Sequence, residues 1–176
     1  NDLDSSIFNQ VQQTTKDALF GILGYDDDKY TVVGNRFILP FSYYQYPVLV
    51  ECWLTKAKVG CPTPLARKDK FAPDPLLPKE TDLMDDYKGS GTDRGHNMPA
   101  AENQCQSMDV QIECFYMSNM TPQYHSLNAG DWKSLETWER QTANELDSVH
   151  VWCGSVGKAK VIGTNRSEEH TSELQS

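Results

Sequence analysis

The sequence predicts a single α+β domain built around a mixed or antiparallel sheet. Three observations favour this fold class. The 176 residues are enough for one domain with a hydrophobic core. Short segments rich in aromatic and β-branched residues, typical of strands, occupy residues 31–54. A longer segment with apolar residues at helical spacing follows at residues 130–146.

The elements are expected in the following order. Apolar residues at helical spacing predict a helix from Ser5 or Ser6 to Ile22. Strands are then expected at residues 31–33, 37–43 and 47–54. Residues 61–85 contain five prolines among charged residues, which indicates a long surface connection. Loops of that length inside a domain are often functional.

The second half carries the remaining elements. A short buried strand is expected at residues 115–117, and closing strands at 149–153 and 160–162. The helix over residues 130–146 is expected to bury one side, formed by Trp132, Leu135, Ala143 and Leu146.

Three short motifs lie within about forty residues of one another. The first is Asp-Arg-Gly-His at residues 93–96, the second is Ser-Asn-Met-Thr-Pro-Gln at 118–123, and the third is Leu-Asn-Ala-Gly at 127–130. Together they resemble the active site of the DNA/RNA non-specific endonucleases. These are metal-dependent enzymes that occur as secreted bacterial nucleases and as the mitochondrial endonuclease G type.

The resemblance covers most of residues 20–163 and implies a ββα-metal (His-Me finger) catalytic motif at the edge of the sheet. It implies hydrolysis of phosphodiester bonds in DNA and RNA, without sugar specificity, to 5′-phosphate ends. That reaction needs an activated water, neutralised phosphate charge and help for the leaving alkoxide.

The resemblance assigns the central roles to two residues. His96 matches the general base, and it must be neutral to take a proton from water, so activity is expected to fall as the pH drops through its pKa. Asn128 matches the metal-binding asparagine, the main protein ligand of a magnesium ion, with manganese as the alternative. One neutral oxygen ligand suits magnesium, which keeps several waters.

Supporting roles follow the same comparison. Arg94 lies two residues before His96, so a strand places both side chains on one face, where the guanidinium could grip a phosphate. Glu136 is eight residues after Asn128, about 80° of rotation on a continuous helix. The resemblance gives Glu136 the task of holding a metal-bound water. Arg140, one turn later, could pair with Glu136 or reach phosphate.

Three further residues complete the expected site. Arg67 resembles a phosphate-binding arginine upstream of the core, and Gln123 is also expected to bind the substrate. Asn119 joins the catalytic set, where it would position the base loop or the substrate. Structural alternatives remain for several of these residues. Asn128 could be a helix-start residue, Glu136 and Arg140 an exposed ion pair, and Arg67 a solvated charge.

Composition limits the partners. The formal net charge of −9 opposes tight binding of nucleic acid, because phosphate binding is driven by positive charge. A turnover enzyme needs only a local positive cleft, and basic residues gather in one stretch: Arg67, Lys68, Lys70, Lys88 and Arg94. No window reaches the roughly eighteen apolar residues of a membrane span, so no membrane partner is expected. The oligomeric state stays open, with a homodimer as one alternative.

The five cysteines show no Cys-x-x-Cys spacing, which makes a structural zinc site unexpected, and their pairing does not follow from sequence. Neither His125 nor His150 has a matching context, and both are expected to be structural or exposed. Residues 166–176 read as the translation of a sequencing adapter. The domain is therefore expected over residues 1–165, truncated at its C-terminus and followed by an artefactual tail.

A non-specific nuclease would damage its own cell, which favours an exported protein, secreted or periplasmic. Two other functions remain open at this level. One is a non-catalytic nucleic-acid or phosphate-binding module of the same fold. The other is a specialised toxin or DNA-uptake nuclease that uses the same residues.

Overall fold

The computed structural model describes residues 31–33, 36–38, 47–77 and 85–154, together with Gln10, Gln13, Asp17 and Ala18. These four single residues are helical, and the rest of the helix expected over residues 5–22 lies outside the described residues. The strand expected at 160–162 and the tail at 166–176 also lie outside them. The domain boundaries therefore stay predictions.

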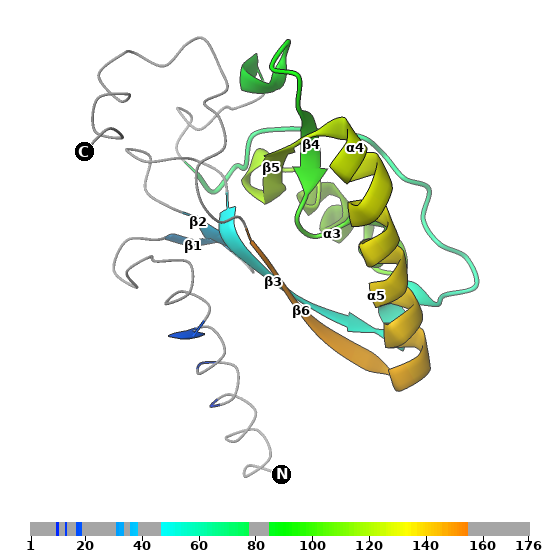
Figure 1. Ribbon diagram of the computed structural model, residues 1–176. Coiled ribbons are helices and arrows are strands. Elements are labelled where there is room, and N and C mark those ends of the chain that lie inside the picture. The colour runs from blue at the N-terminus through cyan, green and yellow to red at the C-terminus, as the bar shows by residue number, and fades with distance from the viewer. Residues whose placement is uncertain are drawn as a thin grey trace.

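The main sheet has four strands in the order β1-β2-β3-β6, and every neighbouring pair is antiparallel (Figure 1). A separate hairpin pairs β4 with β5, also antiparallel. The strands are β1 (Thr31–Val33), β2 (Arg36–Ile38), β3 (Pro47–Thr55), β4 (Asp93–His96), β5 (Met120–Gln123) and β6 (Ser148–Gly154). The strands expected at 31–33, 47–54 and 149–153 are confirmed. The antiparallel alternative of the predicted sheet is the one observed.

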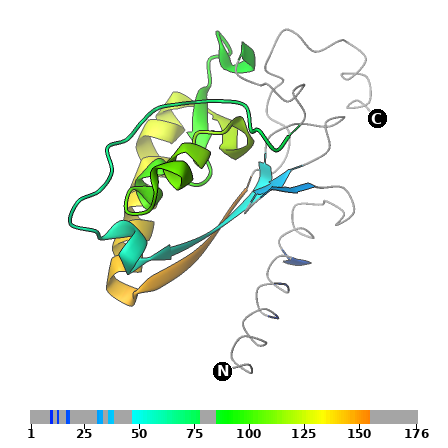
Figure 2. The ribbon, with the colours of Figure 1, turned by 180° about the vertical axis from the view of Figure 1, so that it is seen from behind.

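Helical segments surround the hairpin and cover one face of the β3–β6 pair (Figures 1 and 2). The α-helices are α2 (Lys56–Val59), α3 (Met108–Glu113), α4 (His125–Leu127) and α5 (Lys133–Leu146). Three 3₁₀ turns, η3 (Asp85–Tyr87), η4 (Ala100–Asn103) and η5 (Met117–Asn119), and one π-type turn, η6 (Asn128–Trp132), complete the described elements. Helices and an antiparallel sheet thus form two layers, as expected for the α+β class. Within the described residues, no helix combines the length and the apolar character needed to cross a membrane.

The core lies between this face of the sheet and the helices. Cys52 on β3 lies opposite Val151 on β6, and Leu54 lies opposite Val149, so these side chains share one face. They pack against Phe115 and the other members of one buried cluster. The intervening residues of both strands point to the opposite face, where His150 stacks on Trp53 with ring centroids 4.1 Å apart. Alternation along the two strands therefore separates the core from an aromatic outer face.

The buried side of α5 differs from the sequence prediction. Ala143 is buried as expected, but Leu135 is 43% exposed and Leu146 is 69% exposed. Helical phase puts Glu136 and Arg140 on the same side as Ala143. Ala143 packs in the core, whereas Glu136 and Arg140 line a cavity, so the inner side of α5 is apolar only in part.

Residues 115–117 are buried, but the strand predicted there is wrong. Phe115 is 0% exposed and Met117 is 1% exposed. The amide of Phe115 donates to Ile112 O over 2.9 Å, which closes the end of α3, and η5 follows directly. Apolar character predicted burial correctly, whereas local backbone hydrogen bonds decided the conformation.

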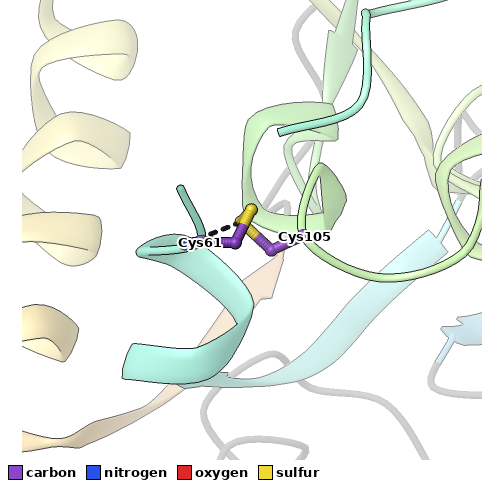
Figure 3. Close-up of a disulfide and its surroundings, with 2 residues drawn as sticks. All are labelled: Cys61 and Cys105. Carbon is purple, nitrogen blue, oxygen red and sulfur yellow. Dashed lines mark hydrogen bonds between the residues drawn. A yellow bond between two sulfur atoms is a disulfide. The ribbon is translucent and has the colours of Figure 1, made fainter. Parts of the chain in front are cut away.

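The long surface connection is irregular over its described part, residues 61–77. A disulfide between Cys61 and Cys105 ties its start to the segment after η4 (Figure 3). Further along, the amide of Ala72 donates to Phe115 O, and that of Met117 donates to Ala72 O. These two hydrogen bonds therefore attach the connection to the segment that contains the buried Phe115. The other three cysteines, Cys52, Cys114 and Cys153, are buried and form no disulfide.

Candidate active site

The candidate site is built on the β4–β5 hairpin and the helical segment that follows it. His96 closes β4 opposite Met120, the first residue of β5. The chain then passes through α4 and η6 into α5. The indole nitrogen of Trp132, at the end of η6, donates to His96 O over 3.2 Å and ties this segment to the hairpin. The order of strand, strand and helix is that of the expected ββα motif.

A cavity of about 790 Å³ opens between these elements. Six of the eight residues that the sequence singled out line it: Arg67, Arg94, His96, Asn128, Glu136 and Arg140. Its remaining charged lining residues are Lys88, Lys133, Asp85 and Asp93. Five cations thus face three carboxylates. The chain as a whole is acidic, yet this cavity carries an excess of positive charge, as an anionic ligand would require.

The His96 ring is held among aromatic side chains. It meets the ring of Phe115 edge-on at 5.1 Å between centroids, and the ring of Phe71 lies 5.8 Å away. Burial and, to a smaller extent, the nearby Arg67 guanidinium lower the pKa of His96 to about 4, with Asp69 partly opposing both. The ring is consequently neutral at physiological pH. Its Nε2 is buried and has no hydrogen-bond partner among the described residues.

Two arginines are placed by aromatic rings at the same wall of the cavity. The Arg94 guanidinium carbon lies 4.9 Å from the centroid of Phe71. That of Arg67 lies 5.4 Å from the centroid of Phe115. Such cation–π contacts hold a guanidinium without using all of its N–H groups. Arg67 also pairs with Asp69 through a 2.7 Å contact from its Nε.

Asn128 lies at the junction of α4 and η6, where the helix is interrupted. Gly130, two residues later, has φ −104° and ψ −107°, outside the helical region. Asn128 and Glu136 therefore do not lie on one continuous helix, as the 80° argument assumed, although both line the cavity. The Asn128 Nδ2 donates to Asp93 Oδ2 over 3.0 Å, which leaves Oδ1 as the acceptor of the amide.

Carboxyl groups of α5 form the far side of the site. Burial raises the pKa of Glu136 to about 7, while Arg140 lowers it. The Arg140 Nη2 donates to Thr137 Oγ1, and its Nη1 is buried without a hydrogen-bond partner among the described residues. Behind this pair, Glu102 of η4 is only 1% exposed. Burial raises the pKa of Glu102 to about 9, and the charges of Glu139 and Glu136 add to the shift.

Replacing Glu102 by glutamine is expected to remove a pH-dependent destabilisation. The folded-state pKa of about 9 lies above that of an unfolded glutamate, so the stability from this group is full in acid and is lost as the pH rises. Glutamine is neutral at every pH. Relative to wild type, the free energy of unfolding of Glu102→Gln should rise by about 2 kcal/mol between about pH 5 and about pH 7. Urea unfolding at both pH values measures it.

The exposed Glu113 provides the matched control for that measurement. The substitution Glu113→Gln makes the same carboxyl-to-amide change at an exposed position of α3 and leaves the buried site unchanged. We expect no comparable pH-dependent difference for this control. A constant difference between Glu102→Gln and wild type at both pH values would show that Glu102 is ionised in the folded protein.

The structure does not bring Asn119 and Gln123 into the cavity. Asn119 is 0% exposed. Its Oδ1 accepts a hydrogen bond from the Met98 amide, and its Nδ2 donates to Met98 O and Cys114 O. It holds the segment that follows His96 and makes no contact with the cavity. Gln123 is buried against Gly95, where an added Cβ would lie 2.2 Å from the Gln123 Cδ. Neither residue lines the cavity. The contacts of Asn119 fit the first of its two expected roles, positioning of the base loop, whereas the structure offers no support for the substrate contact expected for Gln123.

Several lining residues had no assigned role in the sequence reasoning. Asp93 belongs to the first motif and could have been included, since it is the only acid in that tetrapeptide. Phe71 and Tyr87 flank Arg94, with its guanidinium 5.8 Å from the Tyr87 centroid. Lys133 stands at the start of α5. Nothing in the local sequence around Phe71, Tyr87 or Lys133 indicates that they line the same cavity.

The sequence and the fold are similar to those of known nucleases. The family model for the DNA/RNA non-specific endonuclease matches residues 25–172. A mitochondrial nuclease EXOG from Xenopus laevis is 41% identical over 86 residues, which cover 48% of this chain and 24% of that protein. Human mitochondrial endonuclease G is 41% identical over 92 residues, 46% of this chain and 31% of that protein.

Two broader matches agree with these. A nuclease from Nostoc is 30% identical over 140 residues, 74% of this chain and 47% of that protein. Among solved structures, an EndoG in complex with its inhibitor EndoGI has a TM-score of 0.65 at 27% identity, covering 77% of this chain and 61% of that one. The chain thus spans a quarter to a half of the length of these curated relatives.

The prediction of an exported protein is wrong. The matched relatives include mitochondrial nucleases from Xenopus laevis, Schizosaccharomyces pombe and Homo sapiens. Export was inferred only from the need to keep a non-specific nuclease away from the nucleic acid of its own cell. An organelle separates the two equally well, so that need does not distinguish the compartments.

The family assignment itself does not depend on the length of the relatives. The matched stretch, residues 25–172, is most of the chain and contains all three motifs, and the solved EndoG shares the fold. This chain belongs to the DNA/RNA non-specific endonuclease family.

Proposed function

We propose that this protein is a metal-dependent endonuclease that hydrolyses phosphodiester bonds of DNA and RNA without sugar specificity and leaves 5′-phosphate ends. The observation that carries the proposal is the placement of a neutral histidine, His96, and an amide, Asn128, in one cavity whose charge is otherwise mostly positive. The names of the matched nucleases agree with this activity.

The cations of the cavity would bind the phosphodiester. Arg94 belongs to the hairpin, Arg67 to the long connection, and Arg140, whose buried Nη1 has no hydrogen-bond partner among the described residues, to α5. A guanidinium can donate two parallel hydrogen bonds to phosphate oxygens. Charge that develops on those oxygens during attack would be stabilised by groups already in place, which is the largest contribution in many enzymes.

His96 would act as the general base. With a pKa of about 4, its ring is unprotonated at neutral pH and is able to accept a proton from water. A base of so low a pKa is weak. The bound phosphate would raise that pKa, because its negative charge favours the imidazolium form. His96 would therefore become a stronger base when the substrate is in place.

The residues present fit a hard divalent cation. Asn128 offers its Oδ1, and the Asp93 carboxylate that holds its amide also lines the cavity. No group of three or more His, Cys, Asp or Glu side chains within the described ranges is arranged to hold a metal. A site with so few protein ligands suits magnesium, which keeps its waters, or manganese, better than zinc. When bound, such an ion supplies positive charge for the transition state and the leaving oxygen.

Glu136 would hold a water beside that ion. Its raised pKa of about 7 shows how far the carboxyl is desolvated. A cation brought into the cavity would favour its charged form and lower the pKa again. Arg140 acts in the same direction and keeps the carboxylate available.

The lining also supports the proposed lack of base and sugar specificity. Its polar groups are mainly cations suited to phosphate, and contacts to phosphate carry no sequence information. We therefore expect DNA and RNA to be cleaved alike.

Supercoiled plasmid and single-stranded RNA, digested with and without magnesium, test this proposal. Both substrates should be cleaved, EDTA should abolish cleavage, and Asn128→Ala should reduce the rate at least about a hundredfold, the upper range for a weakened metal site. Asn144→Ala, an exposed asparagine of α5 outside the cavity lining, is the matched control and should behave as wild type. If folded protein binds the plasmid but leaves it intact, the chain is a binding module instead.

A further inference from the structure

His125 belongs to none of the motifs that identify the site, yet it contacts one of them. It opens the three-residue helix α4, directly before Asn128. Its Nδ1 lies 2.8 Å from Asp93 Oδ2. The Asn128 Nδ2 donates to the same oxygen over 3.0 Å. One carboxylate oxygen of β4 thus joins two side chains of the following helical segment.

The chemistry of the three groups fixes the direction of these bonds. An amide nitrogen can only donate, so Asp93 Oδ2 is the acceptor from Asn128. A carboxylate oxygen that accepts one N–H also accepts the second, so His125 Nδ1 carries a hydrogen. The amide plane of Asn128 is then fixed with Oδ1 as its remaining acceptor. A rotated amide would present two N–H groups, which repel a cation.

The backbone of Asn128 is helical but close to an interruption. Its amide donates to Tyr124 O over 3.0 Å, and the helical conformation is broken at Gly130. The regular helix α5 therefore does not extend back to Asn128. The contact to Asp93 is the side-chain contact that orients it, and His125 approaches the same oxygen from the preceding turn.

We propose that His125 is a positioning residue for the metal ligand: by donating to Asp93 Oδ2 it fixes the carboxylate that in turn holds the Asn128 amide with Oδ1 available to a divalent cation. This rests on the metal-binding role proposed above for Asn128. The alternative is an ordinary surface pair, since the His125 side chain is 81% exposed. Such a pair contributes little to stability. The two readings differ in what they predict for metal affinity.

Three substitutions at one position separate them. His125→Ala removes the donor. His125→Asn restores it, because the amide nitrogen of asparagine is attached at the same distance from Cα as Nδ1. His125→Gln places its amide one bond further out, where Nε2 stood. Asn128→Ala and His150→Ala serve as the positive and the negative control, and thermal melts accompany all five variants.

The primary measurement is Mn²⁺ binding to the nucleic-acid-free protein, followed by titration calorimetry or by the EPR signal of free Mn²⁺. His125→Ala should weaken binding about tenfold, as loss of groups that orient metal ligands does. His125→Asn should return to within about threefold of wild type, and His125→Gln should resemble alanine. In plasmid cleavage, the magnesium concentration at half-maximal rate should rise in the alanine variant more than the maximum rate falls.

The outcomes are distinct. Equal Mn²⁺ affinity in wild type and His125→Ala, with affinity lost in Asn128→Ala, would overturn the positioning role and leave the proposed metal ligand intact. Unchanged binding in Asn128→Ala would instead remove the metal role on which the inference rests. If His125→Asn is as weak as His125→Ala, the donor to Asp93 is not what matters. Rescue by asparagine but not by glutamine supports the inference.

Discussion

Replacing His96 by alanine is expected to reduce cleavage of both plasmid DNA and RNA by about 10²–10⁴-fold, the usual contribution of a general base. Among the residues that the structure describes, no other imidazole lines the cavity. The ring is neutral because burial and Arg67 lower its pKa. Its removal therefore deletes a group that is active throughout the neutral range. Initial rates with magnesium at saturation measure the loss.

His150→Ala is the matched control for this experiment. His150 is half-buried on the outer face of the sheet, where it bonds Glu51 and stacks on Trp53, and it does not line the cavity. Its loss should leave the rate within about twofold while affecting the melting temperature. The T-shaped contact between His96 and Phe115 also supports packing, so the melt of His96→Ala must be recorded. A folded His96→Ala protein that cleaves at the wild-type rate would assign the base to another group.

Removing the disulfide by the double substitution Cys61→Ser and Cys105→Ser is expected to cost about 4 kcal/mol of unfolding free energy. The bond closes a loop with a sequence separation of 44, and the chain-entropy model gives this magnitude for such a loop. The melting temperature should fall by about 8–16 °C for a chain of this size. Calorimetry or urea unfolding without reductant measures the change.

The reducing agent provides the control, because it should lower the stability of wild type toward that of the double variant and leave the variant itself unchanged. A second consequence concerns Arg67, six residues after Cys61, in a connection tied to the Gln104 carbonyl through Leu65. Loosening this connection should raise KM for nucleic acid more than it lowers kcat. Wild-type protein that titrates with five free thiols would contradict the disulfide directly.

Much of the site could be predicted from local sequence because its parts lie close together along the chain. Arg94 and His96 share a face of β4 through simple strand alternation. Asn128, Glu136 and Arg140 lie on the segment that directly follows the hairpin. Local secondary structure fixes the relative positions of residues that are close together in the sequence, so a sequence pattern can predict those positions.

The sequence predictions were wrong where they required a helix to be regular or amphipathic. The interruption at Gly130 separates Asn128 from α5. Leu135 and Leu146 were expected in the core and are exposed, because the inner side of α5 carries the cavity groups. Hydrophobic periodicity detects an apolar helix face, but it cannot identify a helix whose inner face is partly polar because it lines a cavity.

The sequence by itself determined the family, the positions of several strands and the residue types available for phosphodiester chemistry. Only the tertiary structure decided which of them meet: it brought Arg67 across a long connection to His96, put Asn119 in the core and joined His125 to Asp93. It also lowered the His96 pKa and raised that of Glu102. The reason is that burial and through-space charge depend on distances between segments far apart in the chain, which residue type and spacing alone do not specify.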